Sequence, residues 1–471
     1  MCYECFRFTE LNARRFKIFD SDTHLNPNAE TLERYFDAPM RKRLPEWESC
    51  KVPFRVGWAG EILQPPYRHR YQFKKRAGWR EEVRVLGEAG PREQVERHFP
   101  KFMGSRFPSP GGADDDVEAR IRDMDEEGVD VQLMLPGLPP ATEEVEVEIG
   151  FIRANHRFIE DFCSKHPHRL KSLIVVSSRA IEESVQEVKA WARAPWAAGI
   201  YPHLAESVPI DHPDLEPIWA AADDAGLCVA HHSFTSGYPG YRDLWDNPFI
   251  GRTASHPWGA MRAVSAFFGA GIMDRYPNLR YCILESGFGW LPFWAARMDD
   301  QAIYMSYALP ENLARKPSEY MTSGRFFASL VIHEGEKMAR MVTEFLGDGV
   351  LMYSSDYPHA ESRFPESTNK VLAWESLGDE VMQKMLWDNA VRSSASRSRL
   401  LKRPQAFIAL DRLARTYREY ISAHRFSIAS PRNFLSSLDN NWPVPHVSES
   451  CKPLLVRRNP YFVGCGELSF S

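Results

Sequence analysis

The sequence predicts an α/β protein built as a (β/α)₈ barrel of the TIM type. From residue 116 onward, short apolar segments typical of strands alternate with amphipathic segments typical of helices. One further strand near the start brings the count to eight, each followed by helix, and eight parallel units close most simply into a barrel. No glycine fingerprint follows the first strand, which argues against the rival fold, a doubly wound open sheet.

Residues that interrupt each pattern bound the elements. Gly128 ends the helix predicted at 117–127, and Pro136 stops the strand after it. The predicted strands are 16–19, 129–135, 170–176, 198–204, 227–233, 279–285, 326–333 and 350–356. The predicted helices are 117–127, 144–166, 181–193, 215–225, 258–275, 290–307, 335–346 and 379–390.

The barrel, residues 16–391, is expected to have an extension at each end. Residues 1–15 are interpreted as a loose N-terminal arm. Residues 392–471 form a C-terminal extension that starts with a Ser/Arg-rich linker and is partly disordered, with one amphipathic helix at 406–424.

A long insertion follows the first strand, at residues 26–116. It is rich in Arg, Pro, Gly and Trp, and a structureless loop of that length would be unusual. We therefore expect a cap with short helices over a site. Its basic run at 68–76 is a solvated face or, as the alternative, a lid over an anionic substrate.

Composition narrows the class of function. The net charge of −5 argues against nucleic acid as the main partner, and no apolar run approaches the length of a membrane span. The N-terminus lacks a signal-peptide core, and the eight cysteines are scattered, two of them (Cys228 and Cys282) in predicted buried strands. We expect a cytoplasmic protein with reduced thiols that acts on a small molecule, without a nucleic-acid or membrane partner.

Metal-type side chains end the first strand. Asp20, Asp22 and His24 are spaced two apart, so regular alternation would project them to one side. Carboxylates and a neutral imidazole that converge there suit a divalent metal ion. The alternative is an ordinary surface turn.

Other predicted strands stop on similar residues. Strand five ends with His231 and His232, strand six with Glu285 and strand eight with Asp356. Barrel enzymes place their chemistry at this end of the strands. Several such residues sharing one mouth favour a site over separate helix caps.

Four stretches carry a resemblance to a known family: 22–24, 226–232, 274–292 and 355–359. Over residues 16–390 the sequence resembles the amidohydrolase superfamily. The closer likeness is to its decarboxylase-like amidohydrolase-related branch (amidohydrolase 2), which includes aminocarboxymuconate-semialdehyde decarboxylase. The resemblance implies a (β/α)₈ barrel with one divalent metal ion, zinc first and manganese or iron as alternatives. It also implies a homodimer.

The resemblance implies roles for individual residues. Asp22, His24 and Asp356 would be metal ligands, with Asp356 also able to orient water or substrate. The family spacing puts the strand-five ligand at His232, but a one-residue shift would select His231, so both remain candidates. Strand four carries no Lys that could bridge two ions, which favours a single metal.

Some candidates depart from the family pattern. Glu285 stands where decarboxylases of this branch usually carry a His; it could move a proton, join the metal or be a structural acceptor. His256 and His359 are candidates for a mobile acid or base, with His359 also a candidate substrate contact, or are simply capping residues. Trp290 could line a substrate pocket. Arg297 lies near the position where some relatives bind a substrate carboxylate, often in a neighbouring subunit.

The resulting hypothesis is a metal-dependent carboxy-lyase (a decarboxylase) acting on a small aromatic or unsaturated carboxylic acid. The first alternative is a metal-dependent hydrolase of a C–N or C–O bond, and a hydratase is a further one. The hypothesis from a different class is a non-catalytic binding barrel, which would predict eroded ligand positions.

Overall fold

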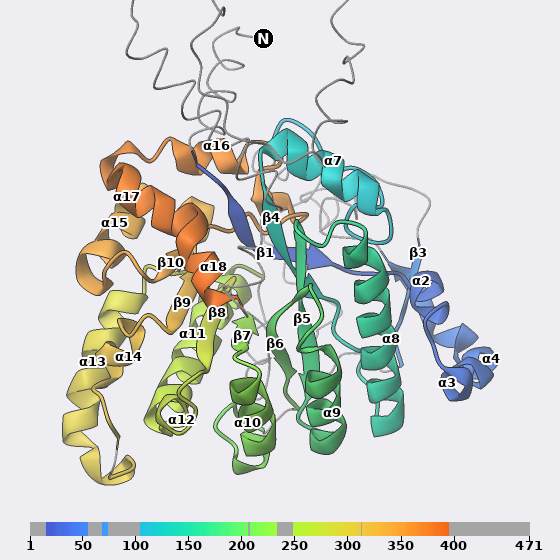
Figure 1. Ribbon diagram of the computed structural model, residues 1–471, viewed down its shortest axis with the longest axis horizontal. Helices are drawn as coiled ribbons and strands as arrows, with labels where there is room; N and C mark the ends of the chain where they lie inside the picture. The colour runs from blue at the N-terminus through green and yellow to red at the C-terminus, as the bar shows by residue number, and fades with distance from the viewer. Residues whose placement is uncertain are drawn as a thin grey trace, which may run out of the picture. The chain divides into compact units, whose positions relative to one another are not determined.

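Eight parallel strands make up the central sheet of the protein (Figure 1). The computed structural model describes residues 16–54, 68–73, 104–205, 208–232, 248–311 and 313–394. Every described residue belongs to one compact unit of the chain. The predicted arm at 1–15 and the predicted helix at 406–424 lie outside the described residues.

The strands follow one another around the sheet in chain order, and each pairs in parallel with the next. The last strand returns to the first: Ser21 N–H donates to Tyr353 O (2.9 Å) and His24 N–H donates to Tyr357 O (2.7 Å). The predicted (β/α)₈ barrel is therefore confirmed. The strands are β1 (Phe19–Leu25), β4 (Val131–Pro136), β5 (Leu170–Ser177), β6 (Ala197–His203), β7 (Cys228–His232), β8 (Arg280–Leu284), β9 (Phe326–Ser329) and β10 (Leu351–Met352).

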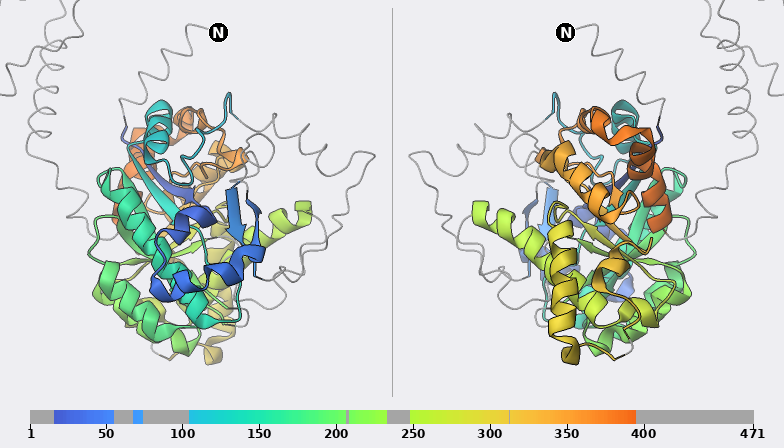
Figure 2. Two further views of the ribbon diagram at one scale, coloured as in Figure 1. Left: turned by 90° about the vertical axis from the view of Figure 1, so that its right-hand side faces the viewer. Right: turned by 90° about the vertical axis from the view of Figure 1, so that its left-hand side faces the viewer.

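Helices surround the strands, as Figures 1 and 2 show. α7 has the predicted bounds: the Asp116 side chain accepts from Ala119 N–H at its start, and Gly128 ends it with φ of 78°. The helices are α7 (Val117–Glu127), α8 (Val145–Ser164), α9 (Ile181–Trp191), α10 (Glu216–Asp224), α11 (Pro248–Gly269), α12 (Ile272–Arg275), α13 (Leu291–Tyr304), α14 (Pro317–Met321), α15 (Gly335–Leu346), α16 (Ser367–Leu372), α17 (Gly378–Gln383) and α18 (Asn389–Ser393). Short helical turns are η3 (Pro213–Leu215), η5 (Ser306–Ala308), η6 (Ile332–Glu334), η7 (Ala360–Ser362), η8 (Glu375–Leu377) and the π-turn η9 (Lys384–Asp388). No helix among the described residues combines the length and apolarity needed to cross a membrane.

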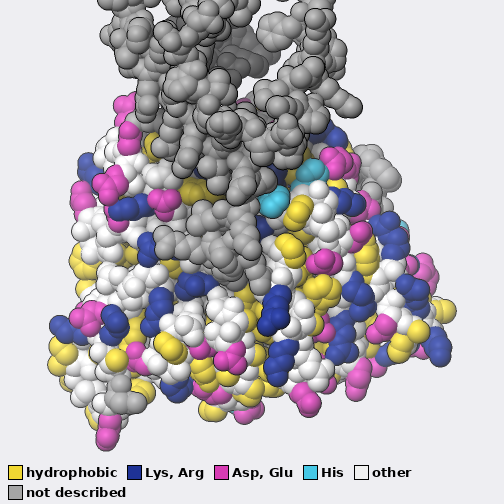
Figure 3. All heavy atoms as spheres, in the orientation of Figure 1, with side chains coloured by type: hydrophobic (Ala, Val, Ile, Leu, Met, Phe, Trp, Pro, Cys, Tyr) yellow, Lys and Arg dark blue, Asp and Glu magenta, His cyan; other side chains and the backbone are white. Residues whose placement is uncertain are grey.

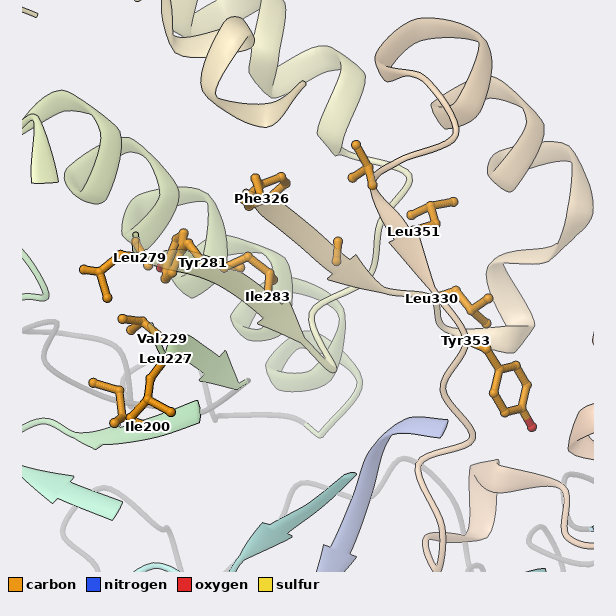
Figure 4. Packing of buried hydrophobic residues seen from close by; sticks show 14 of the residues in the cluster. Ile200, Leu227, Val229, Leu279, Tyr281, Ile283, Phe326, Leu330, Leu351 and Tyr353 are labelled. Atoms are coloured by element: carbon orange, nitrogen blue, oxygen red, sulfur yellow. The ribbon is translucent and has the colours of Figure 1, made fainter. Parts of the chain in front are cut away.

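Alternation along each strand separates two apolar layers. On β7, Val229 packs in the larger layer between strands and helices, whereas Cys228 and Ala230 belong to a smaller cluster with Phe327 of β9 and Met352 of β10. Figure 4 shows the larger layer where β6 to β10 meet their helices. Both faces of every strand are thus covered, which explains their nearly continuous apolar sequences.

The described part of the insertion is a small aromatic subcore against α8. Its elements are α2 (Ala29–Glu33), α3 (Ala38–Lys42), α4 (Leu44–Trp47), η1 (Glu48–Cys50) and the antiparallel pair β2 (Lys51–Phe54) and β3 (Arg68–Tyr71). Phe36, Trp47 and Tyr71 pack with Phe151 of α8. Figure 2 shows these blue elements beside the green α8 in its left view. The expected short helices are present; residues 55–67 and 74–103, and whether they cap a site, lie outside the described residues.

Several predicted bounds were wrong. β1 runs through the Asp-Ser-Asp-Thr-His segment instead of ending before it. β9 ends at Ser329 and gives way to η6, because the chain must turn there towards α15. α11 begins at Pro248, so His256 lies within the helix rather than before it. The predicted helix at 379–390 is interrupted by the π-turn η9.

Candidate metal centre

A β-bulge in β1 separates Asp20 from the other two metal-type residues of this strand, Asp22 and His24. Asp20 lies opposite Gln132 and Thr23 lies opposite Met134, so three steps along β1 match two along β4. The expectation that Asp20 shares a side with Asp22 and His24 is therefore wrong. The Asp20 carboxylate instead accepts from the N–H (3.0 Å) and Oγ–H (2.5 Å) of Ser355, and burial raises the pKa of Asp20 to about 7.

The seam between β1 and β10 brings Asp356 to the same place. Asp356 N–H donates to Asp22 O at 3.0 Å, and Asp356 adopts a left-handed backbone conformation, φ 64°. Buried Arg120 fixes the other side of β1 by donating to His24 O (2.8 Å) and Thr23 Oγ1 (2.6 Å). The end of β1 and the segment that follows β10 are thus held together by hydrogen bonds at the site.

Five buried side chains converge here, and we call them the mouth cluster: Asp22, His24, His232, Glu285 and Asp356. His24 Nε2 lies 2.9 Å from Asp356 Oδ1, 3.9 Å from Glu285 Oε2 and 4.0 Å from Asp22 Oδ1. His232 Nε2 lies 2.8 Å from Glu285 Oε2 and 3.7 Å from Asp22 Oδ1.

These separations fit a shared metal ion. Protein nitrogen and oxygen ligands bind zinc at about 2.0–2.2 Å, so two ligands of one ion are at most about 4.2 Å apart. Neither carboxylate oxygen of buried Asp22 has a hydrogen-bond partner among the described residues. A buried carboxylate without a partner is costly, and a cation next to it would remove that cost. The donor set therefore fits one divalent ion.

The electrostatics of the cluster point the same way. Burial raises the pKa of Asp22 well above its usual range, with the nearby Asp356 and Glu285 charges adding to the effect. Burial, reinforced by the neighbouring His359, lowers the pKa of His24 to about 4, so this imidazole is neutral near pH 7. A neutral imidazole is the form that binds a metal ion.

Of the two adjacent histidines on β7, the mouth cluster contains His232. His231 is buried on the opposite face of the strand, where burial lowers its pKa to about 3. Leu227 and Val229 share that face and pack in the layer between strands and helices. Strand alternation therefore puts His232 on the face opposite to these residues, which favours His232 over His231 as the ligand.

His359 and His256 flank the cluster. The His359 ring stacks on His24 with 4.2 Å between ring centroids, and its Nδ1 lies 2.9 Å from Asp356 Oδ2. Burial alone would lower the pKa of His359, but the Asp356 charge outweighs it and raises the value to about 10. His256 Nδ1 lies 3.8 Å from Glu285 Oε1.

A cavity of about 550 Å³ opens beside the cluster. Asp22, Glu285 and Asp356 line it together with His256 and Trp290. Apolar side chains form another part of its wall: Met261, Leu330, Val331, Ile332 and Met338. Predicted Arg297 is not among the lining residues within the described chain; it is exposed on α13.

Among the cavity residues that sequence reasoning missed is Glu334 of η6. Its carboxylate accepts from Phe288 N–H (3.1 Å) and Gly289 N–H (2.7 Å), in the loop that follows Glu285. Gly287 has a φ of 70°, which favours glycine, and an added Cβ there would displace the Glu334 carboxylate. A signal was available in the sequence, because Glu334 is an acidic residue directly after the predicted strand 326–333.

Residues 20–393 match the sequence profile of the family described as Amidohydrolase. The chain belongs to the amidohydrolase family. The match spans every member of the mouth cluster, and it confirms the resemblance found at the strand ends.

Solved structures of other amidohydrolase-type proteins share the fold. An amidohydrolase from Mycobacterium avium subsp. paratuberculosis is 16% identical, with a TM-score of 0.56, over 80% of this chain and 98% of the other. 5-Carboxyvanillate decarboxylase from Sphingomonas paucimobilis is 16% identical, with a TM-score of 0.54 and the same coverage. The 5-carboxyvanillate decarboxylase of Novosphingobium aromaticivorans, solved with bound manganese, is 18% identical, with a TM-score of 0.55, over 80% and 97%.

Proposed function

We propose that this protein is a metal-dependent carboxy-lyase that releases CO₂ from a small aromatic or unsaturated carboxylic acid. The observation that carries the proposal is the convergence of five ligand-type side chains, from four strand ends, beside a partly apolar cavity. The two solved 5-carboxyvanillate decarboxylases, which share the fold, favour this reaction among those that such a ligand set supports.

Asp22, His24, His232 and Asp356 would hold one divalent ion. Mixed imidazole and carboxylate ligands accept zinc, and a growing share of carboxylates favours harder ions such as manganese or iron. Zinc is the expectation from the sequence, and manganese is the ion bound in a similar structure. Metal content of the purified protein distinguishes them.

The cavity suits a substrate of this class. Its volume of about 550 Å³ is within the ordinary range of small-molecule sites. Trp290 and Met261 offer an apolar surface to a ring, while the polar groups lie on the side of the mouth cluster. When bound, the ion supplies Lewis-acid polarisation of the substrate oxygens. The chain's own residues orient the ring, exclude water and deliver a proton to the carbon that loses CO₂.

Hydrolysis is the second candidate, and Glu285 is the observation that favours it. A carboxylate stands where decarboxylases of the branch usually carry a His, and a carboxylate beside a metal can take a proton from attacking water. Hydrolysis of a C–N or C–O bond would then yield an amine or alcohol without CO₂.

Product analysis separates the two reactions. The purified, metal-loaded protein is incubated with a panel of aromatic and unsaturated carboxylic acids, and CO₂ release is followed together with the organic product. A chelated sample is the matched control. CO₂ release that requires metal supports the carboxy-lyase; amine or alcohol products without CO₂ would contradict it and support the hydrolase.

We also propose that the protein works as a homodimer. α13 and α15 pack together and expose large apolar side chains on their outer surfaces: Phe293, Ile303, Tyr304, Met341 and Phe345. Elsewhere on the face seen in Figure 3, charged side chains of both signs are interspersed over the described surface. Arg297 lies on the same α13, which supports a role at a subunit boundary. Sedimentation of wild-type protein and of Phe293→Ser tests the dimer, and a monomeric wild type would contradict it.

A further inference from the structure

Glu285 faces two different groups with its two carboxylate oxygens. Oε2 lies 2.8 Å from His232 Nε2 and 3.9 Å from His24 Nε2, whereas Oε1 lies 3.8 Å from His256 Nδ1. One oxygen thus points at the ligands of the mouth cluster and the other at a histidine of α11. Because its two oxygens face different groups, this side chain can have two separate roles.

The position of Oε2 is that of a ligand. Both of its distances to ligand nitrogens are below the limit of about 4.2 Å for two atoms that share an ion. Glu285 also falls within a group of possible metal-binding residues together with His24 and Asp356, in which all ligand atoms lie within 4.8 Å of one another. His256 falls in neither group found among the described residues.

The backbone holds Glu285 in this orientation. Its φ is 45°, a left-handed conformation that few non-glycine residues adopt, and its N–H donates to Ser329 Oγ at 3.0 Å. The following loop is clamped by the Glu334 carboxylate through two backbone N–H groups. Such a fixed side chain suits metal binding better than a proton shuttle that must follow the substrate.

His256 is placed on the substrate side. It is buried, lines the cavity and sits one turn before Ala260, which packs in the core, so its helix is anchored. A carboxylate that binds a metal through one oxygen can orient an imidazole through the other. An imidazole is the usual group for proton transfer near neutral pH.

We propose that Glu285 is a fifth metal ligand through Oε2 and a positioning residue for His256 through Oε1, and that His256 delivers the proton. The inference rests on the proposed carboxy-lyase function. The bond between the ring or vinyl carbon and the carboxylate carbon breaks, CO₂ leaves, and the electron pair stays on that carbon. The carbon takes a proton from His256, which recovers one from water. No oxidant or reductant is needed.

Metal binding tests the role of Glu285 without any substrate. The chelated protein is titrated with Co²⁺, and affinity and visible absorption are recorded for wild type, Glu285→Gln, Glu285→Asp and His256→Gln. We expect Glu285→Gln to weaken Co²⁺ binding at least about 10-fold and to change the absorption towards a lower coordination number. Glu285→Asp should restore part of the affinity, and His256→Gln should resemble wild type. Wild-type affinity and spectrum in Glu285→Gln would overturn the ligand assignment.

Turnover tests the role of His256. Once a substrate releases CO₂, His256→Gly should lower kcat by about 10²- to 10⁴-fold with its metal content intact, and added imidazole should restore part of the rate. A structural role alone would not give imidazole rescue. Unchanged kcat in His256→Gly would overturn the proton-donor assignment.

The two proposals can fail separately. If no acid in the panel releases CO₂ but Glu285→Gln loses Co²⁺ affinity, the carboxy-lyase and the proton role of His256 are wrong and the ligand role stands. If CO₂ is released and Glu285→Gln keeps both affinity and spectrum while losing turnover, Glu285 is itself the acid and the inference is wrong.

Discussion

A comparison of two buried clusters of histidine and carboxylate side chains in the described part of the chain shows that they differ in how their polar atoms are satisfied. The α8–α9 cluster consists of His156, Glu187, Arg153 and Trp191. His156 Nδ1–H donates to Glu187 Oε2 (2.8 Å), and His156 Nε2 accepts from Val175 N–H (2.9 Å). Glu187 also accepts from Arg153 Nε–H and Trp191 Nε1–H, each at 3.0 Å. The described residues satisfy this cluster internally.

The mouth cluster contains similar residues, but the described residues do not satisfy all of its polar atoms. Neither oxygen of the buried Asp22 carboxylate has a hydrogen-bond partner among the described residues, and three carboxylates lie together. The comparison teaches that buried ionisable residues alone do not mark a site, because a structural network can look the same in sequence. The distinguishing property is a set of buried polar atoms for which the described residues supply no hydrogen-bond partner.

Metal removal should give the largest difference in response between the mouth cluster and the α8–α9 cluster. Chelation is expected to lower turnover by at least about 10³-fold, because it removes several kcal/mol of transition-state stabilisation. The α8–α9 cluster should not respond, so far-UV circular dichroism should stay the same. Activity assays before chelation, after it and after adding Zn²⁺ or Mn²⁺ check this. Full turnover in a sample with no measurable metal would contradict the assignment of the mouth cluster.

A matched pair of histidine substitutions sharpens the contrast. His232→Ala should weaken metal binding by at least about 100-fold with a modest change in stability. His156→Ala should leave metal affinity unchanged and lower the free energy of unfolding by about 3 kcal/mol, since it opens a cavity and leaves buried partners unpaired. Metal titration and urea unfolding of both variants measure this. Equal metal loss in the two variants would remove the distinction.

Removing one carboxylate charge should change the free energy of unfolding in opposite directions in the two clusters. In chelated protein, Asp22→Asn should raise the free energy of unfolding by about 1–2 kcal/mol, because it removes a buried and crowded carboxylate that has no hydrogen-bond partner among the described residues. Glu187→Gln should lower it by about 1–3 kcal/mol, because its three hydrogen bonds lose the charge of the carboxylate acceptor. Urea unfolding without metal tests the signs, and destabilisation by both substitutions would be the contrary result.

The pH dependence of stability should show the smallest effect. Burial alone would raise the pKa of Glu187, but its hydrogen bond with His156 and the other donors outweigh burial and lower it below the usual 4.5. A lowered carboxylate pKa stabilises the folded state above the unfolded pKa, and this contribution is lost as pH falls through the folded pKa. The stability difference between wild type and Glu187→Gln should therefore be full at pH 6 and shrink towards pH 3. A difference that grows on acidification would show the opposite sign.

Much of the fold and of the site could be predicted from the sequence. Asp22, His24, His232, Glu285 and Asp356 each follow or interrupt an apolar strand, and parallel strands must bring such residues to one end of a barrel. Local pattern was enough because each of the four βα units involved carries its ligand-type residues at the end of its own strand.

The remaining features depend on contacts between distant segments. Asp20 was misplaced because a bulge opposite β4 breaks the alternation in β1. Glu334 acts through backbone N–H groups of another βα unit, which no side-chain pattern encodes. The bounds of α11 were wrong because Pro257, a residue that usually marks a helix boundary, lies inside that helix.

The seam between β1 and β10 also determines when the mouth cluster can be completed during synthesis of the chain. His24 and Asp356 contact each other across 332 positions of the chain. A nascent chain that emerges from the ribosome carries four of the five donors long before the fifth is synthesised, and its unpaired β1 edge has no β10 to meet. The full set of five candidate ligands therefore exists only once residue 356 has been synthesised, and a chain truncated before Asp356 would lack one of them.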